Sequence, residues 1–310
     1  MTNPRTVSIV TGGARGIGRA VALALGAKGH AVCINDTGVA LDGTSPDPGP
    51  AEAVADEVRA AGGNAVAVAI NASTPAGGQE VLSTTAATFG HPASVLVHAA
   101  GTLRDAMVHN ATDEDWAGVL GSHLSVAVEL TRAVAPNLRH QRYGRIVYLG
   151  GAAGLVGSVG QAAYAVAKAG LFGLTRAVAL EMAGRDVCVN YVAPLASTRM
   201  TNSIPPHTEQ LRRYGASTLS ARAEDVAPVV AWLCSGSARG ISGQVLGIRG
   251  AELALWSQPR PALRLVETSG WDAAALDDIR HQLEAHLTPL ESAFDLFGDA
   301  PIAVSGRAAE

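Results

Sequence analysis

Two residues with reactive side chains, Tyr164 and Lys168, stand four positions apart in the sequence Tyr-Ala-Val-Ala-Lys. On a helix this spacing puts both side chains on one face, with the ammonium group close to the phenol. A nearby cation favours the phenolate, which makes the tyrosine a plausible acid or base near neutral pH. The same pair also fits an ordinary amphipathic helix, in which the tyrosine packs and the lysine is solvated. Other residues must decide between a catalytic pair and a packing pair.

A glycine-rich turn follows the first apolar run of the chain and reads Thr11-Gly12-Gly13-Ala14-Arg15-Gly16-Ile17-Gly18. Such a turn between a strand and a helix directs backbone N–H groups and the positive helix end toward a pyrophosphate, and glycines allow its close approach. A turn of this kind also arises for steric reasons alone. We assign a dinucleotide-binding role to Gly12, Arg15, Gly16, Ile17 and Gly18.

Asp36 supports this assignment because it ends the second apolar run, 18 residues beyond Gly18. An acidic side chain there can accept hydrogen bonds from the hydroxyls of the adenosine ribose. A carboxylate would repel a 2′-phosphate, which favours NAD over NADP. Arg15 could instead pair with that phosphate, so NADP stays possible. The alternative for Asp36 is an ordinary loop aspartate.

The charge pattern offers no surface for nucleic acid or for an anionic membrane. The 310 residues carry a formal net charge of −4, and lysine and arginine form no run. We find no apolar stretch of the roughly 18 to 20 residues that span a bilayer, and no signal-like N-terminus. We therefore expect a cytoplasmic protein that acts on a small molecule.

Cysteine and histidine spacing indicates neither a disulfide framework nor a metal site. Cys33, Cys188 and Cys234 are far apart in apolar segments, which fits reduced, buried thiols. The closest histidines, His281 and His286, lack a helical metal-binding spacing and fit a solvated helix face.

Short apolar runs alternate with segments of helical periodicity through residues 1–256. The predicted strands are 6–11, 31–34, 66–70, 95–98, 146–149, 187–192 and 244–248. The predicted helices follow the glycine turn and then cover 51–61, 75–89, 112–139, 164–182 and 224–235, with Thr112 as a helix cap. Nearly all-apolar strands must be buried on both faces. The sequence thus predicts an α/β fold, a doubly wound parallel sheet of the Rossmann-like kind, in a single domain.

The pattern changes in residues 257–310. Pro259 and Pro261 break regular structure, and an apolar stripe then marks a short helix with Leu276, Ile279, Leu283 and Leu287. This segment is too small for a core of its own. We expect a C-terminal helical extension that packs on the core or on a neighbouring subunit.

Four motifs occur in one order: the glycine turn, an Ala100-Gly101 turn after the fourth strand, Tyr164-x-x-x-Lys168, and Asn190-Tyr-Val-Ala-Pro194 after the sixth. Together they resemble the short-chain dehydrogenase/reductase family over about residues 5–250. Three further segments resemble the hydroxyacyl-CoA dehydrogenase unit of multifunctional enzyme type 2 and related bacterial proteins. These are Asn35-Asp-Thr-Gly38, Gly101-Thr-Leu-Arg-Asp105 and Ser197-Thr-Arg-Met-Thr201.

The resemblance implies roles for individual residues. Tyr164 would exchange the proton of the substrate hydroxyl, Lys168 would hold the nicotinamide ribose, and Pro194 would border the nicotinamide. The other cofactor contacts would come from Asn71, Ala99, Ala100 and Gly101. His123 stands where the family has a proton-relay asparagine; it could take that role or simply pack against the sheet.

The sequence departs from the family at Gly151, where the catalytic serine is expected 13 residues before Tyr164. Loss of one such oxyanion donor costs about 10²–10³ in rate in comparable enzymes. Ser158 is the nearest hydroxyl along the chain and a weak substitute. A second departure is His98-Ala99 in place of two asparagines, which puts the hydrogen bonding between sheet and loop there in doubt.

Three functions remain open. The first is an NAD-dependent oxidoreductase acting on a secondary alcohol or ketone in a hydroxyacyl-CoA, polycyclic or similar substrate. Because of Gly151, the second is non-redox acid/base chemistry such as cyclisation, elimination or isomerisation. The third is a catalytically silent binding partner of an active homologue.

By family analogy we also expect a homodimer or homotetramer, assembled through helices 112–139 and 164–182. The segment after Pro194, through Thr218, should cover the substrate.

Overall fold

The computed structural model describes residues 6–40, 44–197, 221–268 and 270–288. They contain one 8-stranded sheet in the order β3-β2-β1-β4-β5-β6-β7-β8. The strands are β1 (Val7–Thr11), β2 (Ala31–Asn35), β3 (Asn64–Val68), β4 (Val95–His98), β5 (Tyr143–Leu149), β6 (Asp186–Leu195), β7 (Val245–Arg249) and β8 (Glu252–Leu255). All neighbours pair in parallel except β7 and β8. The predicted doubly wound sheet is confirmed, and its strand order reverses between β1 and β4.

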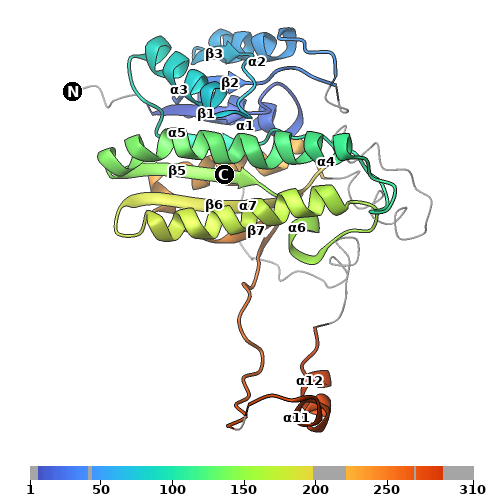
Figure 1. Cartoon of the computed structure of the whole chain (residues 1–310). Coiled ribbons are helices and arrows are strands. Elements are labelled where there is room, and N and C mark those ends of the chain that lie inside the picture. The colour runs from blue at the N-terminus through green and yellow to red at the C-terminus, as the bar shows by residue number, and fades with distance from the viewer. Residues whose placement is uncertain (1–5, 41–43, 198–220, 269, 289–310) are drawn as a thin grey trace.

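Helices cover both faces of the sheet (Figure 1). One core packs α1 (Gly16–Ala27), α2 (Gly49–Ala60) and α10 (Ala223–Leu233) against it. The other packs α3 (Pro75–Phe89), α5 (Val126–Gln141) and α7 (Ala162–Glu181). Strands β1 and β2 are buried at every residue, as expected when apolar side chains point to both faces.

Several elements differ from the sequence predictions. The third strand lies two residues earlier than expected, at Asn64–Val68. The predicted helix 112–139 is interrupted: α4 (Asp113–Leu120) leads into a π-helical turn, η1 (Gly121–Ser125), before α5 begins. Thr112 caps α4 as predicted, and its hydroxyl accepts from the backbone N–H of Asp115. The short antiparallel edge strand β8 was not predicted.

Helix α7 contains an apolar stretch of the length that the sequence analysis did not expect. It has 20 residues, and an 18-residue stretch of it has a mean hydropathy of 1.2, so it is long and apolar enough to cross a bilayer. In the structure it packs on the sheet through Leu171 and Val178. It is therefore a core helix that also carries Tyr164 and Lys168.

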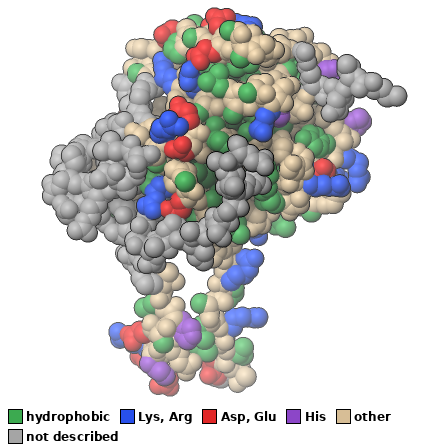
Figure 2. All heavy atoms as spheres, turned by 180° about the vertical axis from the view of Figure 1, so that it is seen from behind, with side chains coloured by type: hydrophobic (Ala, Val, Ile, Leu, Met, Phe, Trp, Pro, Cys, Tyr) green, Lys and Arg blue, Asp and Glu red, His purple; other side chains and the backbone are tan. Residues whose placement is uncertain are grey.

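The described part of the C-terminal extension stands away from the body (Figure 1). Instead of one helix it has two short ones, α11 (Ala273–Asp278) and α12 (Arg280–Glu284), and neither contains a buried residue. Leu276 and Leu283 are 46% and 42% exposed. Apolar side chains are visible on its surface (Figure 2). Whether a neighbouring subunit covers them stays a prediction.

The three cysteines are free and buried, in agreement with the sequence. Within the described ranges, histidine, cysteine and acidic side chains form no group that could hold a metal ion.

Candidate functional site

A cavity of about 570 Å³ opens at the carboxyl ends of the central strands, where the strand order reverses. Ligands bind at this point in open α/β sheets. Every residue assigned to the site from the sequence lines it: Gly12, Arg15, Gly16, Ile17, Gly18, Asp36, Asn71, Ala99, Ala100, Gly101, His123, Tyr164, Lys168 and Pro194. The cavity therefore brings together the glycine turn and the Tyr164–Lys168 pair, which are about 150 residues apart in sequence.

The glycine turn leaves no room for side chains. Gly12 has a φ of +63°, and a Cβ there would lie 2.6 Å from the backbone nitrogen of Ala100. A Cβ on Gly18 would overlap the carbonyl oxygen of Gly12. Helix α1 starts at Gly16 with no side-chain cap and no acidic residue in its first turn. Its N–H groups are thus free of local carboxylates, and the turn fits a pyrophosphate.

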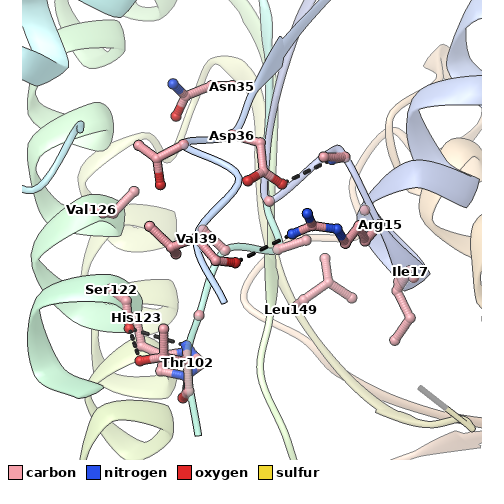
Figure 3. Close-up of a pocket in the computed structure, with 18 of the residues that line it drawn as sticks. Arg15, Ile17, Asn35, Asp36, Val39, Thr102, Ser122, His123, Val126 and Leu149 are labelled. Atoms are coloured by element: carbon pink, nitrogen blue, oxygen red, sulfur yellow. Dashed lines mark hydrogen bonds between the residues drawn. The ribbon is translucent and has the colours of Figure 1, made fainter. Parts of the chain in front are cut away.

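Asp36 and Arg15 are both engaged with the backbone (Figure 3). The Asp36 carboxylate accepts from the Ala14 N–H at 3.0 Å and from the Gly38 N–H at 2.7 Å. Arg15 Nη1 donates to the carbonyls of Gly38 and Val39, at 3.2 and 3.3 Å. These bonds join the glycine turn to the segment after β2. Asp36 binds the glycine turn through the Ala14 N–H and the segment after β2 through the Gly38 N–H.

Thr11 links the ends of β1 and β4 through its hydroxyl. Thr11 Oγ1 lies 3.2 and 3.3 Å from the N–H groups of Ala99 and Ala100, which donate to it, and 2.9 Å from His98 Nδ1. Burial lowers the pKa of His98 to about 3, so the ring is neutral. Thr11 therefore supplies the bonding between sheet and loop that the sequence put in doubt, and His98 bonds to the Thr11 hydroxyl.

Tyr164 and Lys168 lie in the first half of α7 and share a face, as their spacing predicts. Lys168 Nζ is 5.3 Å from the centroid of the Tyr164 ring and donates to the Leu149 carbonyl at 2.7 Å. Burial lowers the pKa of Lys168 to about 7. A lysine in this environment gains and loses its proton in the range where proton-transfer enzymes operate.

His123 sits in the π-helical turn η1, a type of distortion that is frequent at functional sites. Its Nε2 donates to the Thr102 carbonyl at 2.8 Å, and burial lowers its pKa well below the usual value. The ring meets Tyr164 edge-on, with centroids 5.2 Å apart. A Cβ on Gly101 would overlap the His123 ring. The neutral imidazole thus packs directly beside Tyr164, whether or not it relays protons.

Gly151 lies beside Tyr164 and is held by a residue that the sequence analysis missed. A Cβ at Gly151 would be 3.2 Å from Tyr164 Oη. The hydroxyl of Tyr191 accepts from the Gly151 N–H and donates to the Gly151 carbonyl, both at 2.8 Å. Ser158 does not replace the missing serine, because it does not line the cavity and its buried Oγ has no hydrogen-bond partner among the described residues.

Two other hydroxyl residues in the cavity wall were also missed. Thr102 and Ser122 bond to each other, Oγ1 to Oγ at 2.9 Å, and hold the segment after Gly101 against η1. The position of Thr102 next to the Ala100-Gly101 turn could have indicated it. The substrate-covering segment expected after Pro194 lies mostly outside the described residues.

Comparison with known proteins places these features in a family. Residues 12–250 match the family model described as enoyl-(acyl carrier protein) reductase. A protein of Mycobacterium tuberculosis named as a short-chain type dehydrogenase/reductase is 41% identical over 229 residues, 74% of this chain and 77% of that one. The hydroxyacyl-CoA dehydrogenase ChsB1 of the same organism is 36% identical over 283 residues, 87% of this chain and 86% of that protein.

The mouse peroxisomal multifunctional enzyme type 2 is 37% identical over 228 residues, 74% of this chain but 29% of that protein. The chain thus spans under a third of the length of that relative. A solved short-chain dehydrogenase from Mycobacterium avium superimposes with a TM-score of 0.78 at 35% identity, covering 92% of this chain and 96% of that one. The chain belongs to the short-chain dehydrogenase/reductase family, whose members are oxidoreductases.

Proposed function

We propose that this protein is an NAD(H)-dependent oxidoreductase that interconverts a secondary alcohol and a ketone. The observation that carries the proposal is the single cavity that joins the glycine turn and Asp36 to Tyr164 and Lys168. The relative named hydroxyacyl-CoA dehydrogenase supports an acyl-CoA substrate. Polycyclic alcohols are a second candidate class, because they carry the same reacting group, a secondary alcohol.

The cofactor would lie along the cavity from Asp36 to Pro194. The glycine turn and the N-terminus of α1 would bind its pyrophosphate, and Asp36 would accept from the adenosine ribose. When bound, the dinucleotide supplies hydride transfer. Tyr164 exchanges the proton of the substrate oxygen, and Lys168 orients the nicotinamide ribose beside it.

Two features of the adenosine end favour NAD over NADP. The Asp36 carboxylate would repel a 2′-phosphate. Arg15, the residue that could pair with that phosphate, donates to the carbonyls of Gly38 and Val39 instead.

The test measures nicotinamide absorbance while the protein is mixed with NAD⁺ or NADH and a panel of 3-hydroxyacyl-CoA esters, polycyclic alcohols and their ketones. We expect turnover with at least one class and loss of it in Tyr164→Phe. Binding of NADH is measured separately by fluorescence. Tight NADH binding with no redox turnover across the panel would contradict the proposal and favour a catalytically silent binding partner.

Gly151 motivates a second candidate, acid/base chemistry by Tyr164 without net redox change, such as cyclisation, elimination or isomerisation. The side chain that would hold a carbonyl oxygen is absent next to Tyr164 Oη. Turnover of a substrate at constant NAD(H), abolished by Tyr164→Phe, would establish this alternative. Unchanged turnover in that variant would exclude it.

A further inference from the structure

The start of helix α7 sets the position of Tyr164, which is the third residue of that helix. The helix begins without a side-chain cap and without an acidic residue in its first turn. Just before it, Gly157 and Gly160 have φ angles of +88° and +74°, a region that glycine adopts without strain. Because the helix does not fix its own start through a cap, contacts from other segments matter for the position of Tyr164.

The segment after β4 supplies such a contact at Gln161, the residue before α7. Ala106 forms a parallel bridge with Gln161, and its N–H donates to the Gly160 carbonyl at 2.8 Å. Gln161 Nε2 donates to both carboxylate oxygens of Asp105, at 3.2 and 3.1 Å. The buried Gln161 also accepts the N–H of Ala165 at its carbonyl, at 2.8 Å, which closes the first turn of α7. One residue thus connects Asp105 to that turn.

The same segment holds the ring that packs beside Tyr164. The Thr102 carbonyl accepts from His123 Nε2 at 2.8 Å, and the His123 ring meets Tyr164 edge-on. Three residues after Thr102, Asp105 binds Gln161, which lies three residues before Tyr164. Neither Asp105 nor Gln161 lines the cavity. Their effect on the site must therefore pass through Tyr164 and its helix.

We propose that Asp105 is a positioning residue for Tyr164 and acts through Gln161. The Asp105 carboxylate holds the Gln161 amide, Gln161 holds the first turn of α7, and the Tyr164 hydroxyl keeps its place at the substrate oxygen. This inference rests on the proposed function and deepens it, because it concerns the same site. A displacement of about 1 Å at a reacting group can lower a rate about 10²-fold. The role requires an acceptor at position 105 and a donor at position 161, and it does not require a charge.

The experiment alters the two partners singly and together, with the most active compound of the substrate panel. Asp105→Ala and Gln161→Ala should each lower kcat about tenfold, whereas Asp105→Asn keeps an acceptor and should stay within about threefold of the natural protein. Gln161→Glu sets two carboxylates against each other and should also lower kcat about tenfold. Adding Asp105→Asn to Gln161→Glu should restore most of the activity, because the amide and the carboxylate then exchange places.

Two readouts separate positioning from a mere loss of folded protein. The solvent deuterium isotope effect on kcat should rise in Asp105→Ala, because proton transfer at Tyr164 becomes slower relative to hydride transfer. A smaller folded fraction would lower kcat and leave this ratio unchanged. In the protein without cofactor, amide hydrogen exchange at the start of α7 should be about tenfold faster in Asp105→Ala than in Asp105→Asn. Asp113→Ala is the matched control, since it removes an exposed carboxylate at the start of α4 and should change neither readout.

The outcomes separate this inference from the proposed function. If the natural protein turns over a compound of the panel and Asp105→Ala has the same kcat and isotope effect, the inference is overturned and the proposed function stands. An Asp105→Asn variant as slow as Asp105→Ala, or no recovery in the exchanged pair, overturns the inference as well, because the charge and not the hydrogen bond would then matter. If the natural protein turns over no compound of the panel, the proposed function fails and the inference fails with it.

Discussion

At the scale of single residues, Asp36 and Arg15 both bind the segment after β2. The carboxylate of Asp36 fixes the Ala14 and Gly38 N–H groups, and this places the Gly38 and Val39 carbonyls within reach of Arg15. An arginine in a glycine turn is therefore not by itself a sign of NADP. We expect Arg15 to keep its bonds to the Gly38 and Val39 carbonyls only while Asp36 holds the segment after β2 in place.

Asp36→Ala should raise the ratio of kcat/KM with NADP to that with NAD by about 10- to 100-fold. The substitution removes the repulsive carboxylate and frees Arg15 to pair with the 2′-phosphate, a charge-assisted interaction of about 1.5–3 kcal/mol. The measurement is steady-state kinetics with both cofactors. Adding Arg15→Ala in the Asp36→Ala background should remove much of the gain. A double variant that uses NADP as well as Asp36→Ala would rule out this role for Arg15.

Lys168 makes stability depend on pH. Burial lowers its pKa in the fold from 10.5 to about 7, while the unfolded chain keeps the ordinary value. Between these two values the unfolded state binds a proton that the folded state lacks, so the free energy of unfolding rises with pH. The slope is about 1.4 kcal/mol per pH unit, and the full destabilisation is present below pH 7.

Urea unfolding of the natural protein and of Lys168→Met, without cofactor, isolates this contribution. Lys168→Met has no charge to bury, so it should be the more stable protein at pH 6. Its advantage should shrink steadily between pH 7.5 and pH 9. A difference in unfolding free energy that stays constant from pH 6 to pH 9 would show that Lys168 is not titrating in this range.

Residue types and spacing were sufficient to name part of the cavity wall but not its hydrogen bonds. Tyr164, Lys168 and the glycines were found because local spacing determines their placement. Tyr191 was not, because its partner Gly151 is 40 residues away and the contact exists only after β5 and β6 pair. The partner of His98 is likewise distant, because its Nδ1 bonds to Thr11, from a strand 87 residues earlier.

At the scale of elements, the π-helical turn η1 joins α4 to α5 and contacts Tyr164 of α7 through His123. It interrupts the segment predicted as one helix and places His123 between Gly101 and Tyr164. Periodicity could not reveal it, because one extra residue in a turn barely changes an apolar pattern of this length. Edge strand β8 escaped prediction for a related reason: its four residues alternate between half-buried and exposed.

Gly101→Ala tests the contact between the turn after β4 and η1. Its Cβ would overlap the His123 ring, so η1 must shift and carry the edge of the Tyr164 site with it. We expect a loss of about 1–3 kcal/mol in unfolding free energy, as for overpacked cores, together with at least tenfold lower activity. Gly173→Ala is the control. Gly173 lies in α7 with no atom within 4 Å of the added Cβ, so the substitution should stabilise by about 0.5–1 kcal/mol. Similar behaviour of the two variants would show that the η1 contact is unimportant.

At the scale of the whole molecule, the body and the C-terminal extension are unlike each other. The body buries two cores on either side of one sheet. The extension leaves several of its described apolar residues exposed, among them Trp271 at 46% and Val266 at 88%. Gln258 holds the start of the extension, because its Nε2 donates to the Gly243 carbonyl at 2.7 Å. Exposed apolar side chains on so short a segment favour a covering partner, and a second copy of this chain is the partner that the expected homo-oligomer provides.

Removal of residues 260–310 should therefore change assembly and leave the body folded. The truncation retains Gln258 and every strand of the sheet. In light scattering after gel filtration, we expect the full chain to be a dimer or tetramer. The truncated chain should dissociate already at protein concentrations at least tenfold higher than those at which the full chain dissociates. Circular dichroism and NADH binding should be unchanged, because the described cofactor residues all precede position 197. If both chains show the same mass and the same concentration dependence, the extension does not contribute to assembly. A monomeric full chain would refute the expected oligomer itself.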